Sequence, residues 1–86
     1  MRHYSGILVL TEMDCLDRCR AQLEELPGVE VHYCYPDSGR IIAVQETETV
    51  GDQEEGLQRI QRLPTVTMAA LVEHRIDDEE DLPGGK

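Results

Sequence analysis

The chain has 86 residues, a formal net charge of −10 at pH 7, and neither Phe nor Trp. This length suits one small domain, whose core must be aliphatic because Phe and Trp are absent. The acidic charge excludes nucleic-acid binding, which needs clustered basic residues and usually stacking aromatics. The apolar runs are far shorter than the ~18 residues that a membrane span needs, so no membrane insertion is expected.

The first half of the chain predicts a strand followed by a helix. Residues 3–10 form a short apolar run with β-branched residues, which is typical of a buried strand. Apolar residues then recur at three- and four-residue spacing and predict one stripe on a helix of about three turns. These residues are Leu16, Cys19, Leu23 and Leu26. Pro27 cannot continue the helix and Gly28 suits the reversal, so a strand is expected to begin at Val29.

Residues 29–46 predict a β-hairpin. Two runs of strand character flank a Pro-Asp-Ser-Gly turn at residues 36–39, where Pro presets φ and Gly accepts a positive φ. Three cross-strand pairs follow from this turn: Tyr35 with Arg40, Tyr33 with Ile42, and Val31 with Val44. Strict alternation places the remaining side chains on the opposite face of the sheet. These are His32, Cys34, Ile41, Ala43 and Gln45.

The second half repeats the order of helix and strand. Thr49 is suited to cap a second helix with apolar positions Leu57, Ile60 and Leu63. Two glycines inside this helix, Gly51 and Gly56, each cost up to ~1 kcal/mol relative to Ala. The Leu-Pro pair at 63–64 then repeats the pair at 26–27 and starts a last strand at residues 66–74.

The predicted order of elements is βαββαβ. With right-handed crossovers this order gives an α+β, ferredoxin-like sandwich: a four-stranded antiparallel sheet with two helices on one face. We expect a single domain over residues 1–76. Residues 77–86 carry five acids and one Lys and predict an acidic, disordered tail.

This fold leaves one face of the sheet without helices. Alternation assigns to that face a set of largely apolar side chains. A sheet face that stays exposed to water would be expected to carry polar side chains instead. The set comprises His32, Cys34, Ile41, Ala43, Thr67, Ala69 and Leu71. We therefore expect a partner to bind there, and the chain itself to be a monomer.

Little in the sequence indicates catalysis. Ser5 lies in a predicted strand and Ser38 in a predicted turn, with no His and acid placed to activate either hydroxyl. The chain has no glycine-rich phosphate cradle, and its many carboxylates are spread over helix surfaces and the tail. We expect neither an enzyme nor a bound cofactor.

The three cysteines leave alternatives open. An odd number at unrelated spacings suits free thiols in a reducing cytoplasm, where we expect the protein. Cys15 and Cys19 lie four positions apart on the first helix, and their thiolates could hold Cu(I) or Zn(II) in a metal carrier. The apolar stripe favours Cys19 as a core residue instead. A small-ligand regulatory module that dimerises through sheet edges is a third possibility for this fold.

Four stretches of the chain together resemble the NapD family. They are the strand at 6–10 (GILVL), the joint at 26–32 (LPGVEVH), the hairpin arm at 38–44 (SGRIIAV) and the strand at 66–74 (VTMAALVEH). The likeness runs without gaps from about residue 6 to residue 74. Thr65 stands where the family usually has Gly, which is expected to weaken the second turn. Glu73 stands where the family usually has Tyr.

The resemblance implies a function. NapD-like proteins are small cytoplasmic assembly chaperones of periplasmic nitrate reductase. They bind the twin-arginine signal peptide of the catalytic subunit, NapA, across the helix-free sheet face and delay export until the molybdenum cofactor is inserted. An acidic chain attracts the basic segment of such a peptide, and an apolar face suits its apolar segment.

Overall fold

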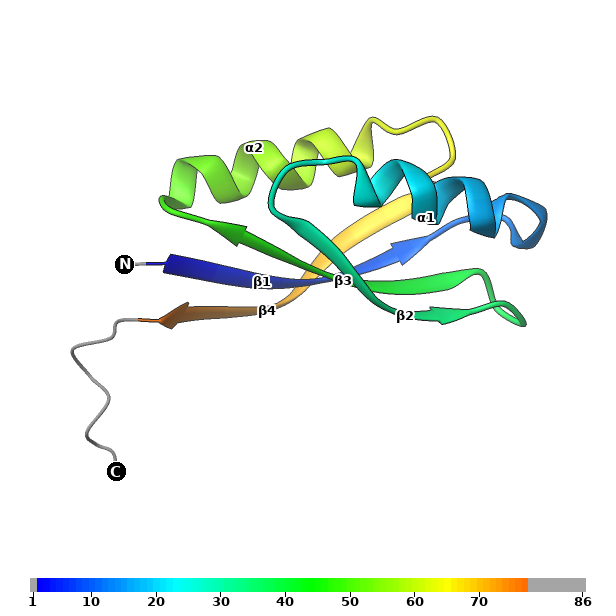
Figure 1. Cartoon of the computed structure of the whole chain (residues 1–86), viewed down its shortest axis with the longest axis horizontal. Coiled ribbons are helices and arrows are strands. Elements are labelled where there is room, and N and C mark those ends of the chain that lie inside the picture. Colours follow the sequence, from blue (N-terminus) through cyan, green and yellow to red (C-terminus); the bar gives the residue numbers. More distant parts are fainter. Residues whose placement is uncertain (1, 78–86) are drawn as a thin grey trace, which may run out of the picture.

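The computed structural model describes residues 2–77, which form one sheet and two α-helices (Figure 1). In chain order the elements are β1 (Arg2–Leu10), a 3₁₀ turn η1 (Met13–Cys15), α1 (Leu16–Glu24), β2 (Val29–Tyr35), β3 (Arg40–Thr47), α2 (Val50–Gln61) and β4 (Met68–Asp77). Asp77 therefore ends a strand, whereas the rest of the predicted tail, residues 78–86, lies outside the described residues. Within residues 2–77, no helix is long and apolar enough to cross a membrane.

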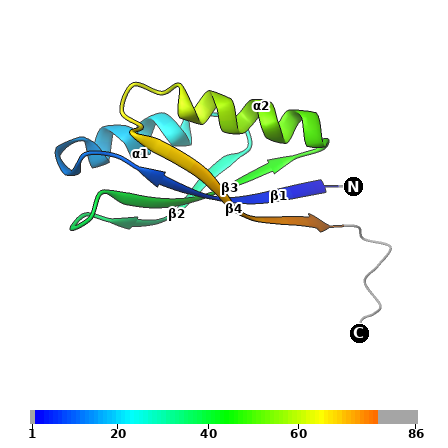
Figure 2. The same cartoon turned by 180° about the vertical axis from the view of Figure 1, so that it is seen from behind.

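The strands form one antiparallel sheet in the order β2-β3-β1-β4. Both helices lie on the same side of this sheet, and the views from front and back agree on this (Figures 1 and 2). The predicted ferredoxin-like sandwich is confirmed. The second helix starts where its cap predicts, because the Asp52 amide donates to Thr49 Oγ1 at 3.0 Å.

The two Leu-Pro joints are built differently. Gly28 in the first joint has a φ of 76°, and a Cβ there would lie only 2.7 Å from the Glu46 carbonyl oxygen. No non-glycine residue among those described has a positive φ, so Thr65 in the second joint needs no left-handed backbone. Thr65 Oγ1 instead donates to Gln22 Oε1 at 2.7 Å, and its carbonyl accepts from Thr11 Oγ1 at 2.6 Å. Thr65 was expected to weaken the second turn, but its hydrogen bonds to α1 and to the end of β1 hold this turn in place.

The core lies between the helices and the inner face of the sheet. It is aliphatic, as predicted, and includes the buried Cys19 of the first helix stripe. Its buried members are Ile7, Val9, Leu16, Cys19, Leu23, Ile41, Ile60 and Ala69.

The predicted assignment of residues to the helix-free face is wrong for most of the residues in the predicted set. Ile41 and Ala43 are fully buried and Ala69 is 5% exposed, so all three lie beneath the helices instead of on the helix-free face. Cys34 also packs against the core. Leu71 is paired with the buried Ile7 and therefore belongs to the same, helix-covered face, although it is partly exposed.

Two irregularities in the sheet also break strict alternation within a strand. The register of β2 against β3 shifts between Val31 and Tyr33, so Val31 pairs with Ala43 and not with Val44 as predicted. The predicted pairs of Tyr33 with Ile42 and Tyr35 with Arg40 are confirmed. A second shift in the pairing of β1 with β4 lies at Gly6 and Ile7. An alternating pattern does not predict such bulges, beyond which the side chains of the strand point to the opposite face.

Candidate functional site

The face of the sheet opposite the helices, here called the open face, carries a band of apolar side chains. Half-buried aliphatic side chains run along its centre, and exposed side chains lie on its two edge strands. These half-buried residues are Leu8, Leu10, Ile42 and Val44 on the two central strands, with Ala70 beside them on β4. Tyr33 (61% exposed), Tyr35 (43%) and Met68 (44%) lie at the edges. An apolar sheet face of this kind marks an interaction surface.

One end of the open face, near the β2–β3 turn, is aromatic. Tyr33 and Tyr35 stack with ring centroids 6.4 Å apart. The Arg40 guanidinium lies over the Tyr35 ring, 5.5 Å from its centroid, and its Nε donates to Ser38 Oγ at 3.0 Å. This end offers rigid, amphipathic rings to a partner.

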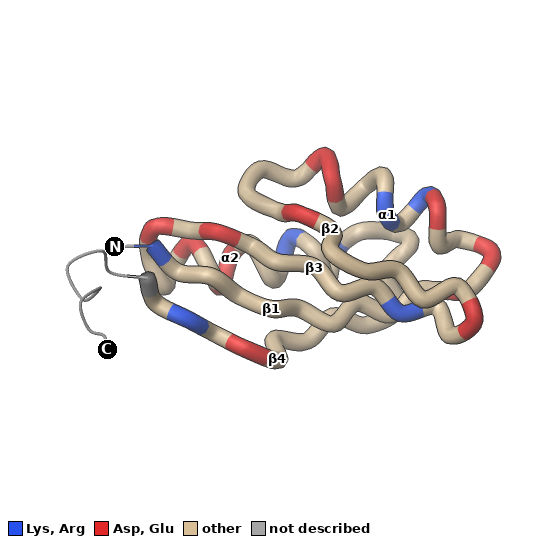
Figure 3. The backbone as a smooth tube through the Cα atoms, turned by 60° about the horizontal axis from the view of Figure 1, so that its bottom comes forward, with Lys and Arg blue, Asp and Glu red and all other residues tan. Residues whose placement is uncertain are grey.

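The other end of the open face, near the chain termini, is charged. Arg2 pairs with Glu46 at 3.1 Å, and His32 Nε2 lies 3.7 Å from Glu30 Oε1. Seen from the open side, the charged positions of β4 fall in its half next to the termini, and the rest of that strand is uncharged (Figure 3). The open face is therefore divided along the strand direction into a charged half and a mainly apolar half, in which Arg40 is the charged side chain over Tyr35.

A hollow of about 200 Å³ lies where these halves meet. Its floor is Gly6 in β1, which leaves a gap between the side chains of the neighbouring strands. The walls are Tyr4, His32, Val44, Glu73 and Arg75. The hollow thus combines aromatic rings, one aliphatic wall and one charge of each sign.

Among the predicted site residues, His32 alone borders this hollow. Thr67 is exposed just before β4, and its amide donates to the Leu10 carbonyl at 2.8 Å. The other predicted residues face the helices, as described above. The open face is instead lined by residues such as Tyr33 and Ile42. Of these, only tyrosine could have been assigned from the sequence, because it keeps its hydroxyl in water and so favours an uncovered face.

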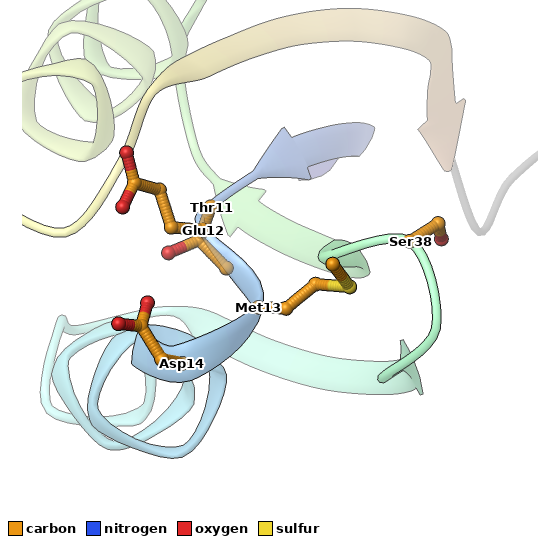
Figure 4. Close-up of a pocket in the computed structure, with 5 residues that line it drawn as sticks. All are labelled: Thr11, Glu12, Met13, Asp14 and Ser38. Atoms are coloured by element: carbon orange, nitrogen blue, oxygen red, sulfur yellow. The ribbon is translucent and has the colours of Figure 1, made fainter.

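A second hollow, of about 530 Å³, lies at the junction of β1 and α1. Thr11, Glu12, Met13, Asp14 and Ser38 line it. Met13 reaches toward the turn that carries Ser38, whereas the carboxylates of Glu12 and Asp14 point away from Met13 (Figure 4). Because its polar groups do not converge on one point, this hollow has no arrangement for catalysis or ligand binding.

The cysteines are arranged unlike a metal site. Cys19 is fully buried in the core, so its thiol cannot join Cys15 at a ligand without opening the helix–sheet packing. Desolvation, and next the negative charge of Asp14, raise the pKa of the Cys15 thiol and disfavour the thiolate that binds metals. Among the described residues, no three His, Cys, Asp or Glu side chains are grouped closely enough to hold a metal ion.

The fold and its open face define a ferredoxin-like domain that presents an uncovered, apolar and partly charged sheet surface. The sequence profile of the NapD protein family matches residues 2–78 of this chain. The chain therefore belongs to the NapD family. This is a family of chaperones, so the expectation that the protein is not an enzyme is confirmed.

Solved structures share the fold. The solution structure of the Escherichia coli Tat proofreading chaperone protein NapD superposes with a TM-score of 0.81 at 22% identity, covering 99% of this chain and 90% of that chain. A hypothetical protein from Pyrococcus horikoshii gives 0.71 at 20% identity, over 95% and 98%. An AsnC-family transcriptional regulatory protein from Pyrococcus furiosus gives 0.66 at 21% identity, over 92% and 55%. No curated protein sequence matches the chain significantly.

Proposed function

We propose that this protein is a cytoplasmic, monomeric chaperone that binds the twin-arginine signal peptide of a NapA-like catalytic subunit of periplasmic nitrate reductase. Binding would hold the subunit back from export until its cofactor is inserted. Membership of the NapD family supports this proposal, as does the likeness to the Tat proofreading chaperone of Escherichia coli.

The observation that carries the proposal is the open face itself. A twin-arginine signal peptide has a basic segment followed by an apolar segment. The open face offers an apolar surface with Tyr33 and Ile42, next to a charged half that contains Glu30, Glu46 and Glu73. The net charge of −10 attracts the basic segment over longer distances.

Isothermal titration of the full-length protein with the leader peptide of a NapA-like subunit tests the proposal. We expect binding at or below tens of micromolar, which weakens when both arginines of the pair are replaced by glutamine. Because the attraction is partly electrostatic, the affinity should fall as salt rises. A folded protein that does not bind the leader at this concentration would refute the proposal, and binding that ignores salt would refute its electrostatic part.

A further inference from the structure

The open face is graded along the axis of β1. Cross-strand pairing puts Gly6 level with Val44 and Glu73. The next position on the same face, Tyr4, is paired with Arg75. Toward the other end, Leu8 is level with Ile42 and Ala70. Apart from Arg40, which is level with Leu10 and Tyr35, the charged positions precede the apolar ones in the direction in which β1 runs. A twin-arginine leader is graded in the same order, with its basic segment before its apolar segment.

The hollow at Gly6 lies in the charged half of the open face and can accept a side chain. A Cβ on Gly6 would lie 3.3 Å from the Glu73 Cβ, so the hollow exists because this strand position has no side chain. Glu46 pairs with Arg2 at 3.1 Å, and the Glu30 carboxylate lies 3.7 Å from His32 Nε2. None of the ion pairs within residues 2–77 engages Glu73.

We infer that the hollow at Gly6 receives one arginine side chain of the signal peptide, which pairs with Glu73, while the apolar segment lies over Leu8 and Ile42. This inference rests on the proposed function and adds the direction of the bound peptide, which runs from amino to carboxyl end in the same sense as β1. The hollow suits a guanidinium because that group pairs with a carboxylate through two donors and packs flat against aromatic rings. Tyr4 and His32 supply such rings.

Arg75 should oppose the binding of a peptide arginine in this hollow. It also borders the hollow and carries the same charge as the proposed occupant. Its side chain is exposed, so it can swing into solvent when the peptide binds, but its charge still opposes that of the incoming arginine. Two residues that lie two positions apart in β4 should therefore affect binding in opposite directions.

Calorimetric titrations of full-length variants test the pairing. Glu73→Gln should lower the affinity for the leader about fivefold at low salt, as for a partly exposed charged pair. Gly6→Ala should lower it at least as much, and Arg75→Gln should raise it. Glu55→Gln removes the same charge from the exposed surface of α2 and should change the affinity less than about twofold. Equal effects of Glu73→Gln and Glu55→Gln would overturn the inference.

The arginine that enters the hollow is identified by combining changes on both sides. The loss caused by Glu73→Gln should vanish with a leader in which that arginine is glutamine, because the pair is then already broken. Thermal unfolding of each variant confirms that it is folded. If the loss is the same for every arginine-substituted leader, Glu73 does not pair with an arginine and the inference is wrong.

Spin labels at either end of the leader test its direction. A label at the amino end should broaden the amide signals of Tyr4, Gly6 and Glu73, and a label after the apolar segment should broaden those of Leu10 and Tyr35. The reverse pattern would refute the inference and leave the proposed function intact. A leader that does not bind at all would refute both.

Discussion

At the scale of single residues, Gly56 shows how a poor helix former is required by packing. A Cβ at this position of α2 would overlap the side-chain amide of Gln45, which is 2% exposed and lies between the sheet and the helix. Gln45 Nε2 donates to the Gln53 carbonyl at 3.2 Å and is thereby held in place. Gly56 lowers the helix propensity of α2, but it lets α2 pack closely against Gln45 of β3.

We therefore predict that Gly56→Ala destabilises the protein by ~1–3 kcal/mol through overpacking, although alanine favours the helix. Gly51→Ala in the same helix is the matched control, since the nearest atom to its Cβ would be Thr49 Oγ1 at 3.8 Å. That variant should be neutral or gain up to ~1 kcal/mol. Urea unfolding of both proteins measures the difference. If the two alanine variants are equally stable, Gln45 does not occupy the space above Gly56.

At the scale of elements, the second Leu-Pro joint depends on a side chain where the first depends on backbone conformation. Thr65 is 9% exposed, and its hydroxyl and carbonyl link the start of β4 to α1 and to Thr11 at the end of β1. A glycine at this position would supply only the carbonyl. The joint thus ties together two chain segments that are distant in sequence.

Thr65→Val removes the hydroxyl while keeping the shape, and should lower the free energy of unfolding by ~1–2 kcal/mol because Gln22 Oε1 loses its donor. Thr67→Val makes the same change at an exposed position two residues later and should alter it by less than ~0.5 kcal/mol. Chemical unfolding curves compare the two. Equal stabilities would mean that the hydrogen bond to Gln22 adds nothing.

The elements themselves were predictable because their signals are local. Periodic leucines mark α1, the Thr49 cap marks the start of α2, and the turn at residues 36–39 fixes the pairing of Tyr35 with Arg40. The bulge near His32 was not predictable, since it depends on how β2 fits against its neighbour. It moves Tyr33 and Tyr35 to the face opposite Val31.

At the scale of the whole molecule, the sequence does not decide which face of the sheet the helices cover. In β3 both alternating sets are apolar, so Ile41 and Ile42 are equivalent in any hydrophobic pattern. The structure buries Ile41 completely beneath the helices and leaves Ile42 half-buried on the open face. The fold could be predicted from the order of elements, but the site could not, because the choice of face rests on contacts between distant segments.

These two neighbouring isoleucines separate stability from binding. Ile41→Ala leaves a cavity in the core and should destabilise the protein by ~2–5 kcal/mol. Ile42→Ala creates no cavity, because its side chain faces away from the helices, and should cost less than ~1.5 kcal/mol.

The effects on the leader peptide should be reversed. Ile42→Ala removes apolar surface next to Tyr33 and should weaken binding severalfold, by up to ~1.5 kcal/mol. Ile41→Ala, measured at a temperature where it is fully folded, should bind almost as the parent protein does, because residue 41 faces the helices and not the open face. Calorimetric titration and thermal unfolding of both variants supply the four numbers. If Ile41→Ala weakens binding while folded and Ile42→Ala does not, the peptide does not bind on the open face.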